Sequence, residues 1–337
     1  MPALHLDDLD QNILDHIDLG TEPLVNKLAE STRMSRQTIS TRLRRLLEHG
    51  FIDASGQGRG RAYKLAWQYA EPQRFPLTGL QEDRVMREAV APHIADLPDN
   101  VRDMWQYGIT EMVNNAIDHS DGTTLSLYLR RNVRRVEVAI QDDGEGIFQR
   151  IQRLLGLFEA RESIVELAKG KLTTDPSRHS GEGIYFTSRV FDQFALQSRT
   201  LHFSHTANGD WLIDSAADSP GTTVLLTLAL DSTRILKTVF DEYAASEEYS
   251  FSKTRVPVRL AHHEGEKLLS RSQAKRLVAR FERFQIVILD FSGIEEIGQA
   301  FADELFRVFA STHPAVALQV ENVTPAVADM IRRARNA

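Results

Sequence analysis

The chain has 337 residues, of which 42% are hydrophobic and 26% charged, a composition typical of an ordinary soluble protein with two or three domains. Its formal net charge of -7 argues against general coating of nucleic acid, although a local basic patch remains compatible with DNA binding. The absence of cysteine excludes disulfides, thiolate metal sites and cysteine nucleophiles. Because the sequence shows neither a signal peptide nor a run of eighteen apolar residues, we expect a cytoplasmic protein that makes no membrane contact.

Three short helices are predicted in the first fifty residues. Apolar residues recur at helical spacing up to Gly20, and a second short helix is expected over residues 21–30. Ser35 is a candidate N-cap for a third helix, which would end at His49 before Gly50. The basic and polar residues of this third helix lie largely off its apolar stripe.

A β-hairpin is expected next, with strands at residues 51–53 and 62–65 around a basic, glycine-rich tip. Three helices followed by such a hairpin resemble a winged helix-turn-helix domain, which we place at residues 1–70. In that family the third helix enters the major groove and the wing touches the backbone or the minor groove. The resemblance implies DNA contacts from the following residues: Arg36, Gln37, Thr41, Arg44, Arg45, Arg59 and Arg61.

Local charge favours this interpretation, because nine basic residues between Lys27 and Lys64 stand against three acidic ones in a globally acidic chain. The alternative is that the arginines form a solvated helix face, in a winged helix that serves as a protein–protein module.

A domain boundary is predicted near residues 70–76, where two prolines interrupt any periodicity. A helix is expected from Gln81 to Ile94. A second helix follows, with Asp99 or Asn100 as its cap.

The stretch from Glu111 to Ser120 is the most distinctive part of this second helix. At 100° per residue, Glu111, Asn115 and Asp118 fall within a narrow arc, while apolar residues occupy roughly the opposite side. One face can therefore be buried while the other presents two carboxylates and an amide to a common space.

Two glycine-containing turns follow. Strands are expected at residues 124–130 and 133–140, and the second leads into Asp142-Asp143-Gly144-Glu145-Gly146-Ile147. An acidic residue followed by paired glycines suits a ligand that hydrogen-bonds a carboxylate while lying against bare backbone. Residues 180–186 carry a second pair of glycines before a helix, whose amides would face a phosphate.

In this order and spacing, the Glu-x3-Asn helix, the Asp-x-Gly-x-Gly strand end and the Gly-x-Gly helix start resemble the GHKL ATP-binding domain. This is the Bergerat-fold α/β sandwich of gyrase B, Hsp90, MutL and histidine kinases. The resemblance covers about residues 78–230, including Gly221-Thr222-Thr223 before a final strand. We place the domain at residues 76–232, with a lid at about 148–179.

The resemblance implies ATP and Mg²⁺ as ligands. Asn115 would ligate Mg²⁺ bridging the phosphates. Asp118 would contact water molecules bound to the Mg²⁺ ion or support one of the ligands of the ion. Asp142 would accept a hydrogen bond from the adenine amino group. The remaining binding residues implied are Gly144, Gly146, Ile147, Gly181, Gly183, Thr222 and Thr223. The lid cations Lys169, Lys171 and Arg178 are candidate phosphate contacts, but for each we expect a solvated surface instead.

Glu111 is the implied catalytic residue, because the matching glutamate in the family orients or deprotonates a water, or assists transfer to a protein residue. The alternative is a nucleotide site with negligible turnover. A sensor histidine kinase is rejected, because the sequence offers only residues 81–94 where a two-helix dimerisation hairpin with a phosphoacceptor histidine would be needed, so His93 is expected to be an ordinary residue.

The last part of the chain, residues 233–337, predicts a linking helix with Ile235 inward and then a small α/β layer. Leu289-Asp290-Phe291-Ser292-Gly293-Ile294 followed by a helix resembles the STAS fold of anti-sigma-factor antagonists, in the STAS-like branch DUF4325. Alignment on Asp290 puts residues 298–300 where antagonists carry a phosphoacceptor serine, so the acceptor is missing. Ser270, Ser272 and Ser292 remain conceivable acceptors.

The combination predicts a multidomain α/β protein that acts as an ATP-responsive bacterial-type regulator. The winged helix would bind DNA, the GHKL domain Mg-ATP, and the STAS-like domain a regulatory protein or the GHKL domain itself. Two alternatives stay open: an anti-sigma-like serine protein kinase in a partner switch, and a GHKL ATPase that forms a homodimer on ATP to act on DNA.

Overall fold

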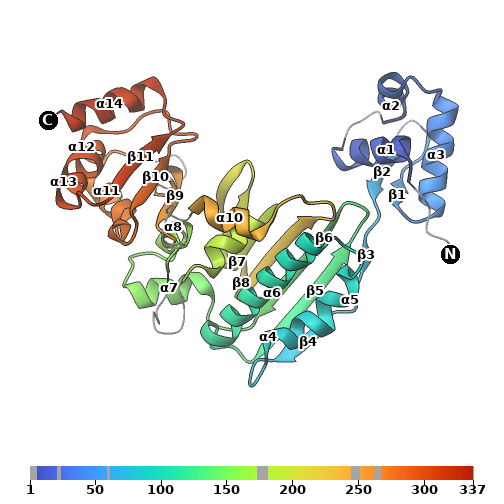
Figure 1. Ribbon diagram of the computed structural model, residues 1–337, viewed down its shortest axis with the longest axis horizontal. Helices are drawn as coiled ribbons and strands as arrows, with labels where there is room; N and C mark the ends of the chain where they lie inside the picture. Colours follow the sequence, from blue (N-terminus) through green and yellow to red (C-terminus); the bar gives the residue numbers. More distant parts are fainter. Residues whose placement is uncertain are drawn as a thin grey trace. The chain divides into compact units, whose positions relative to one another are not determined.

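The computed structural model describes residues 6–20, 24–58, 61–172, 181–243, 251–261 and 267–336. The described chain is a mixed α/β protein with several sheets (Figure 1). It separates into two compact units: Met1–Glu71 with Leu129–Glu137, and Pro72–Tyr128 with Val138–Ala337. Over the described residues, no helix is both long enough and apolar enough to cross a membrane.

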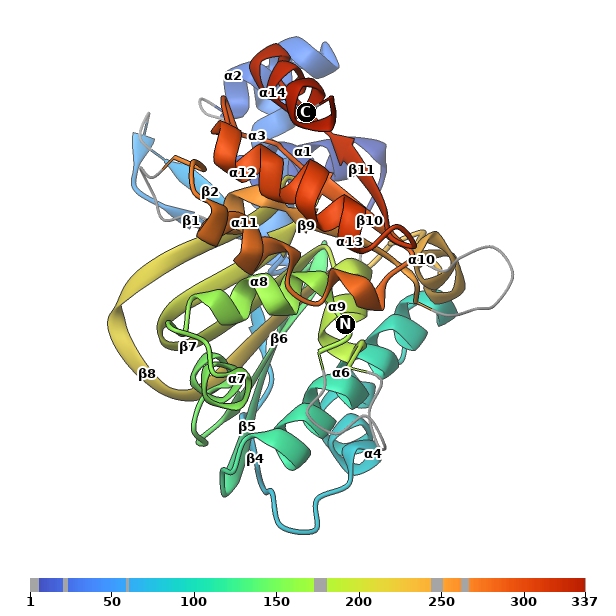
Figure 2. The ribbon, with the colours of Figure 1, turned by 90° about the vertical axis from the view of Figure 1, so that its left-hand side faces the viewer.

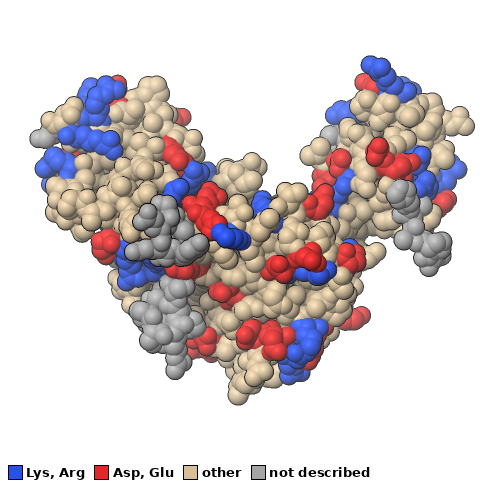
Figure 3. Space-filling view, viewed as in Figure 1, with Lys and Arg blue, Asp and Glu red and all other residues tan. Residues whose placement is uncertain are grey.

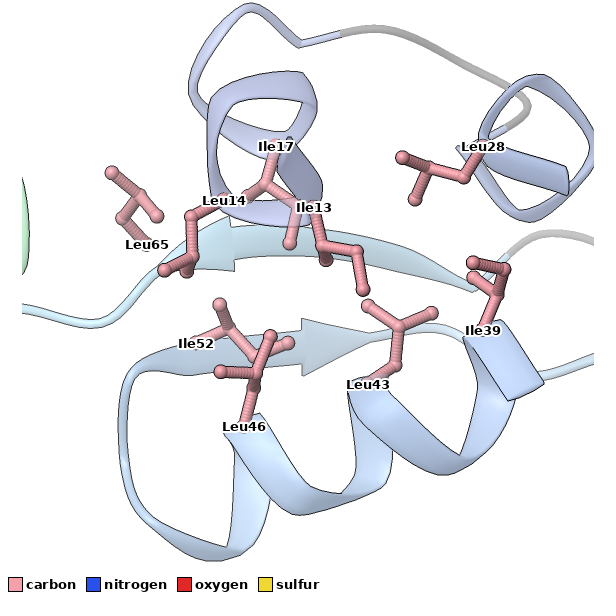
Figure 4. Packing of buried hydrophobic residues seen from close by; sticks show 9 residues of the cluster. All are labelled: Ile13, Leu14, Ile17, Leu28, Ile39, Leu43, Leu46, Ile52 and Leu65. Atoms are coloured by element: carbon pink, nitrogen blue, oxygen red, sulfur yellow. The ribbon is translucent and has the colours of Figure 1, made fainter. Parts of the chain in front are cut away.

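The first unit consists mainly of three helices and a β-hairpin. Its elements are α1 (Asp8–Asp18), α2 (Leu24–Thr32), α3 (Arg36–Glu48), β1 (Ile52–Ser55), β2 (Ala62–Leu65) and β3 (Gln68–Tyr69). β1 and β2 pair antiparallel, with Ile52 opposite Leu65. Apolar side chains from all three helices and both hairpin strands form one core (Figure 4): Ile13, Leu14, Ile17, Leu28, Ile39, Leu43, Leu46, Ile52 and Leu65.

Helix capping and one buried carboxylate hold the helices of this unit together. The Ser35 hydroxyl accepts a hydrogen bond from the backbone N–H of Thr38 at 3.0 Å, so the predicted N-cap of α3 is confirmed. Asp10 on α1 is fully buried and lies 3.2 Å from Arg42 and 3.4 Å from Arg45, both on α3. Since a buried carboxylate needs partners, these two arginines fix α1 against α3.

The tip of the next hairpin, formed by β5 (Thr124–Arg131) and β6 (Arg135–Asp142), also belongs to the first unit. Val133 packs against its apolar core. The guanidinium of Arg134 donates to the carbonyl of Gln11 at 2.7 Å and pairs with Asp15 at 2.7 Å. This unit is therefore completed by residues about sixty positions beyond its last helix and hairpin.

A six-stranded sheet dominates the second unit. Its main path runs β3-β5-β6-β8-β7, and β4 (Gln73–Pro76) also pairs with β5. β7 (Gln193–Thr206) and β8 (Gly209–Ala229) form a long antiparallel hairpin. β5 and β6 alternate buried and less buried residues, as half-covered strands do.

The helix predicted over residues 81–94 is present as α4 (Glu82–Val85), the π-helical turn η2 (Met86–Val90) and α5 (Ala91–Ile94). It leads into α6 (Asp99–His119), whose N-cap is Pro98 without a side-chain hydrogen bond. The prediction that Asp99 or Asn100 caps α6 was therefore wrong. The Asn100 amide instead donates to the carbonyls of Ser232 and Arg234 at 2.7 and 2.9 Å, a long-range use that no local pattern reveals.

Two helices occupy much of the segment predicted as a polar lid, α7 (Ile147–Leu155) and α8 (Glu162–Lys169), and α9 (Gly183–Val190) follows it. Every residue of α8 after Glu162 is buried. Lys169 is 1% exposed, so the expected solvated surface was wrong for this residue, whereas Lys171 is half-buried. Arg178 lies outside the described residues.

The linking helix is α10 (Leu236–Tyr243), and Ile235, expected to point inward, is 56% exposed. Beyond it a three-stranded parallel sheet has the order β11-β10-β9. Its strands are β9 (Lys253–Pro257), β10 (Ile286–Asp290) and β11 (Ala317–Glu321). The helices of this layer are η3 (Val258–Ala261), α11 (Arg271–Val278), η4 (Phe281–Arg283), α12 (Gln299–Asp303), η5 (Glu304–Phe309), α13 (Ala310–Thr312) and α14 (Pro325–Arg335).

Gly108→Ala should destabilise the second unit, although alanine favours a helix by about 1 kcal/mol. A Cβ at Gly108 on α6 would lie 2.3 Å from the ring of Phe191, which is buried edge-on against Trp105. Overpacking of this kind costs about 1–3 kcal/mol, so the midpoint of urea unfolding should fall. Gln106→Ala, at an exposed position of the same helix, is the control. An unchanged or raised midpoint for Gly108→Ala would contradict the contact.

Candidate functional site

The second unit contains a cavity of about 280 Å³ between α6, the end of β6, residues 222–224 of β8, α7 and the start of α9. It is lined by residues from segments more than one hundred positions apart, including Glu111, Asn115, Asp142, Gly183 and Thr222. Its volume is at the low end of the range for small-molecule sites. The cavity therefore brings together the motifs that the sequence separates.

The α6 wall carries Asn115 and Glu111. The Nδ2 atom of Asn115 is buried and has no hydrogen-bond partner in the part of the chain that the structure describes. Since the oxygen and nitrogen of an amide are distinguished only by their partners, a half-turn of this side chain would present Oδ1 at the same place. A buried, unsatisfied amide at a cavity wall is suited to a polar ligand or a metal ion.

Glu111 lies at the N-terminus of α9. A Cβ added to Gly183 would meet Glu111 Oε2 at 2.0 Å, so any larger residue there would displace the end of the Glu111 side chain. Burial raises the pKa of the Tyr107 hydroxyl, and the nearby carboxylates of Glu111 and Glu182 raise it further. Because Glu111 lies at the start of α9, the partial positive charge of this helix N-terminus favours its ionised carboxylate.

Asp142 ends β6 and is buried at the opposite wall. Its Oδ1 accepts hydrogen bonds from the backbone N–H groups of Gly144 at 2.9 Å and Thr222 at 3.2 Å, and neither bond uses Oδ2. Burial raises the pKa of Asp142 despite these two donors. A carboxylate so placed can accept a further hydrogen bond from a ligand.

Thr222 on β8 connects three parts of this wall. Its hydroxyl accepts from the backbone N–H of Ile147 at 2.9 Å, at the start of α7. Its own N–H donates to Asp142, and the preceding Gly221, at φ +71°, lies against the Asp142 carbonyl. Thr222, one of the predicted binding residues, therefore lies beside Asp142.

The structure describes all eleven predicted residues of this site, and seven of them line the cavity: Glu111, Asn115, Asp142, Ile147, Gly181, Gly183 and Thr222. Asp118 is exposed and lies outside the lining, as do Gly144, Gly146 and Thr223. Gly144 is required for packing, because a Cβ there would lie 2.0 Å from the Ser120 carbonyl. Gly146 likewise leaves room for Ser198.

Further lining residues were not predicted: Met112, Ala116, His119, Ser120, Ile140, Arg150, Ile151, Leu154, Leu167, Leu172, Ile184, Tyr185, Leu196 and Val224. Most are apolar and resemble any core residue in the sequence. Arg150 is the lining residue that the sequence could most readily have indicated, because it follows Gly146 by one helical turn at the start of α7. Its guanidinium pairs with Asp121.

A magnesium ion fits this chemistry in one respect only, through Asn115. Over the described ranges, no three His, Asp or Glu side chains gather in a way that could hold a metal ion. An ion here would therefore need the oxygen of one amide together with oxygens from a ligand and water, which is how Mg²⁺ is commonly held beside phosphates.

The residues predicted to contact DNA occupy a second surface, in the first unit. Arg36, Gln37, Thr41 and Arg44 are exposed on α3, and Arg61 is exposed at β2. Arg45 is instead paired with buried Asp10, so part of its charge serves the fold. Figure 3 shows Lys and Arg side chains at the edge where α3 lies, interspersed with acidic ones. Arg59 lies outside the described residues.

Comparison with known families gives a match at the C-terminus. Residues 273–328 match the family described as a STAS-like domain of unknown function (DUF4325). The C-terminal domain is STAS-like. The resemblance predicted around Asp290 is thereby confirmed for this domain, whose match spans β10, β11 and most of α11. No curated protein matches the chain.

Asp142→Asn and the adjacent Asp143→Asn should change stability in opposite directions. The pKa of Asp142 is raised, so its ionised form opposes folding at neutral pH, and any stabilisation by this group is lost as pH rises through the folded pKa. The pKa of Asp143 is lowered by hydrogen bonds from Thr124 and Thr123, so its stabilisation is present at neutral pH and lost as pH falls through the folded pKa.

At pH 7, Asp142→Asn should therefore raise the thermal unfolding midpoint and Asp143→Asn should lower it, measured by calorimetry. The difference between Asp143→Asn and wild type should disappear in acid. A lowered midpoint for Asp142→Asn at neutral pH would show that its hydrogen bonds outweigh its burial.

Proposed function

We propose that this chain is an ATP-responsive regulator. Its central region is a GHKL domain of the Bergerat fold that binds Mg-ATP, its N-terminal unit is a winged helix-turn-helix that binds DNA, and its STAS-like domain is regulatory. The observation that carries the proposal is the convergence of Glu111, Asn115, Asp142 and the Gly181–Gly183 turn on one cavity, in the chain order that GHKL domains use.

The chemistry of the cavity walls supports a nucleotide. Asp142 would accept a hydrogen bond from the adenine amino group through its second oxygen, while apolar residues such as Ile140 and Val224 would contact the base. The N-terminus of α9 at Gly183 would face the phosphates. Asn115 would hold Mg²⁺, which supplies charge neutralisation at the phosphates when it is bound.

The position of Glu111 bears on turnover. Its carboxylate lies at the helix start that a phosphate would approach, so it is close enough to act on a water at the terminal phosphate. It would also repel the phosphates, because both groups are anionic. We infer that Glu111 lowers nucleotide affinity but promotes hydrolysis.

Exposed polar residues on α3 support the DNA-binding part of the proposal. Arg36, Gln37, Thr41 and Arg44 share this exposed surface, whereas Arg42 and Arg45 pair with Asp10 and keep α3 in place. This division separates residues available for recognition from those required for the fold.

Asn115→Ala should abolish the Mg²⁺-dependent part of ATP affinity, and Glu111→Gln should keep or increase affinity while removing turnover. The expected loss for Asn115→Ala is about tenfold or more, the scale of one lost charge-assisted contact. Binding is measured by calorimetry with and without Mg²⁺, using a non-hydrolysable analogue. Gln106→Ala on the same helix is the control.

Incubation with γ-labelled ATP shows the fate of the phosphate. If the wild-type chain releases free labelled phosphate and Glu111→Gln does not, the result would support Glu111 as the base. Label on protein would favour a serine kinase, and no binding of ATP by the wild-type chain would refute the proposed function.

Arg44→Ala should weaken DNA binding about equally for all sequences and reduce the slope of log affinity against log salt by about one, because it removes one phosphate contact. Fluorescence anisotropy with duplex DNA at several salt concentrations measures both effects. Glu48→Ala, which removes an exposed negative charge from the same helix, should leave affinity unchanged or increase it. Equal salt slopes for Arg44→Ala and wild type would exclude the contact.

A further inference from the structure

The STAS-like domain holds one wall of the candidate nucleotide cavity. α8 lies against this domain in both Figure 1 and Figure 2. It contacts β9 and η3. Ion pairs join the two parts: Arg276 approaches Glu162 at 3.5 Å and Arg280 approaches Glu166 at 3.7 Å. The wall is therefore bound to the C-terminal domain by specific charges as well as by apolar packing.

Lys169, the last residue of α8, is the buried centre of this contact. Its ammonium donates to Glu166 Oε1 at 2.5 Å and to the carbonyls of Arg276 and Ala279 at 3.2 and 2.8 Å. Its own carbonyl accepts from the Thr254 hydroxyl at 2.7 Å. Because a buried ammonium is costly without partners, the STAS-like domain supplies groups that α8 needs to keep Lys169 inside.

Lys171 has a strained backbone that the same domain stabilises. Its φ of +53° is left-handed, which costs a residue with a side chain about 1–2 kcal/mol. The carbonyl of Lys171 accepts from the guanidiniums of Arg280 and Arg283, each at 3.1 Å, and its ammonium donates to the Arg283 carbonyl at 3.1 Å. These three hydrogen bonds oppose relaxation of the strain.

The strained residue adjoins the cavity. Leu172, the next residue, lines it, and its backbone N–H donates to the carbonyl of Gly181 at 3.0 Å. Leu167 and Gly181 line the cavity as well. A shift of Lys171 would therefore move a wall that ends at Gly181, two residues before the start of α9 at Gly183.

We propose that the STAS-like domain maintains the nucleotide site in its binding-competent shape by clamping α8 and Lys171. Release of the clamp lets Lys171 relax and separates Leu167 and Leu172 from the cavity, so nucleotide affinity falls. The ligand in this inference rests on the proposed function, whereas the clamp rests on the contacts themselves. Displacement of the STAS-like domain by a partner would then lower ATP binding through these residues.

The test uses the full chain with the double variant Arg280→Ala, Arg283→Ala. A fluorescent ATP analogue with Mg²⁺ should bind about tenfold more weakly, because two hydrogen bonds to one carbonyl are lost. Hydrogen exchange should accelerate at residues 162–172. Arg271→Ala is the control, since this exposed α11 residue pairs with Asp303 and should change neither measurement. Thr254→Val, a milder change, should weaken binding to a smaller extent in the same direction.

The outcomes are distinguishable. Unchanged or tighter binding by the double variant would overturn the clamp, as would unchanged exchange at residues 162–172. An equal loss in Arg271→Ala would also overturn it, because a general loss of stability would then explain the effect. A wild-type chain that binds no nucleotide would refute the proposed function. This outcome is measured on the wild-type chain alone and does not depend on the variants.

Discussion

The fixed position of α6 is the constraint on which the candidate site depends. The helix is held near its start by the Asn100 amide on the Ser232 and Arg234 carbonyls, and in its middle by the close approach of Gly108 to Phe191. At its end, the Ser120 carbonyl accepts from the backbone N–H of Glu145 at 2.9 Å. Because all three contacts involve long-range partners, Glu111 and Asn115 are placed by the whole domain rather than by their own turn.

The cavity itself opposes the stability of the fold. Asp142 is buried with a raised pKa, and Asn115 leaves an amide nitrogen unsatisfied. Natural proteins tolerate such local costs mainly where a ligand later relieves them. Two of them on the walls of one cavity are more informative than any one of the motifs, since each alone also occurs in proteins that bind nothing.

Sequence patterns predicted most elements and seven of the residues that line the cavity, because periodicity and paired glycines are local signals. They failed where a distant partner decides the outcome. Asn100 resembles a helix cap, but its amide donates to the Ser232 carbonyl. Lys169 resembles a solvated cation, but its ammonium donates to carbonyls of the C-terminal domain. Gly144 was predicted for a ligand, yet its missing Cβ is needed first by Ser120. The apolar lining residues carried no signal that separates them from core.

The hairpin tip at residues 129–137 limits how the first unit can be inherited. Val133 completes the core of this unit and Arg134 pairs with Asp15. Both residues follow Glu71, where the first continuous segment of this unit ends, by about sixty positions. A gene fragment that ended there would lose an apolar contact and leave Asp15 of α1 without its arginine partner. Recombination should therefore transfer this unit only together with strands β5 and β6, so that the first unit and the sheet are inherited together.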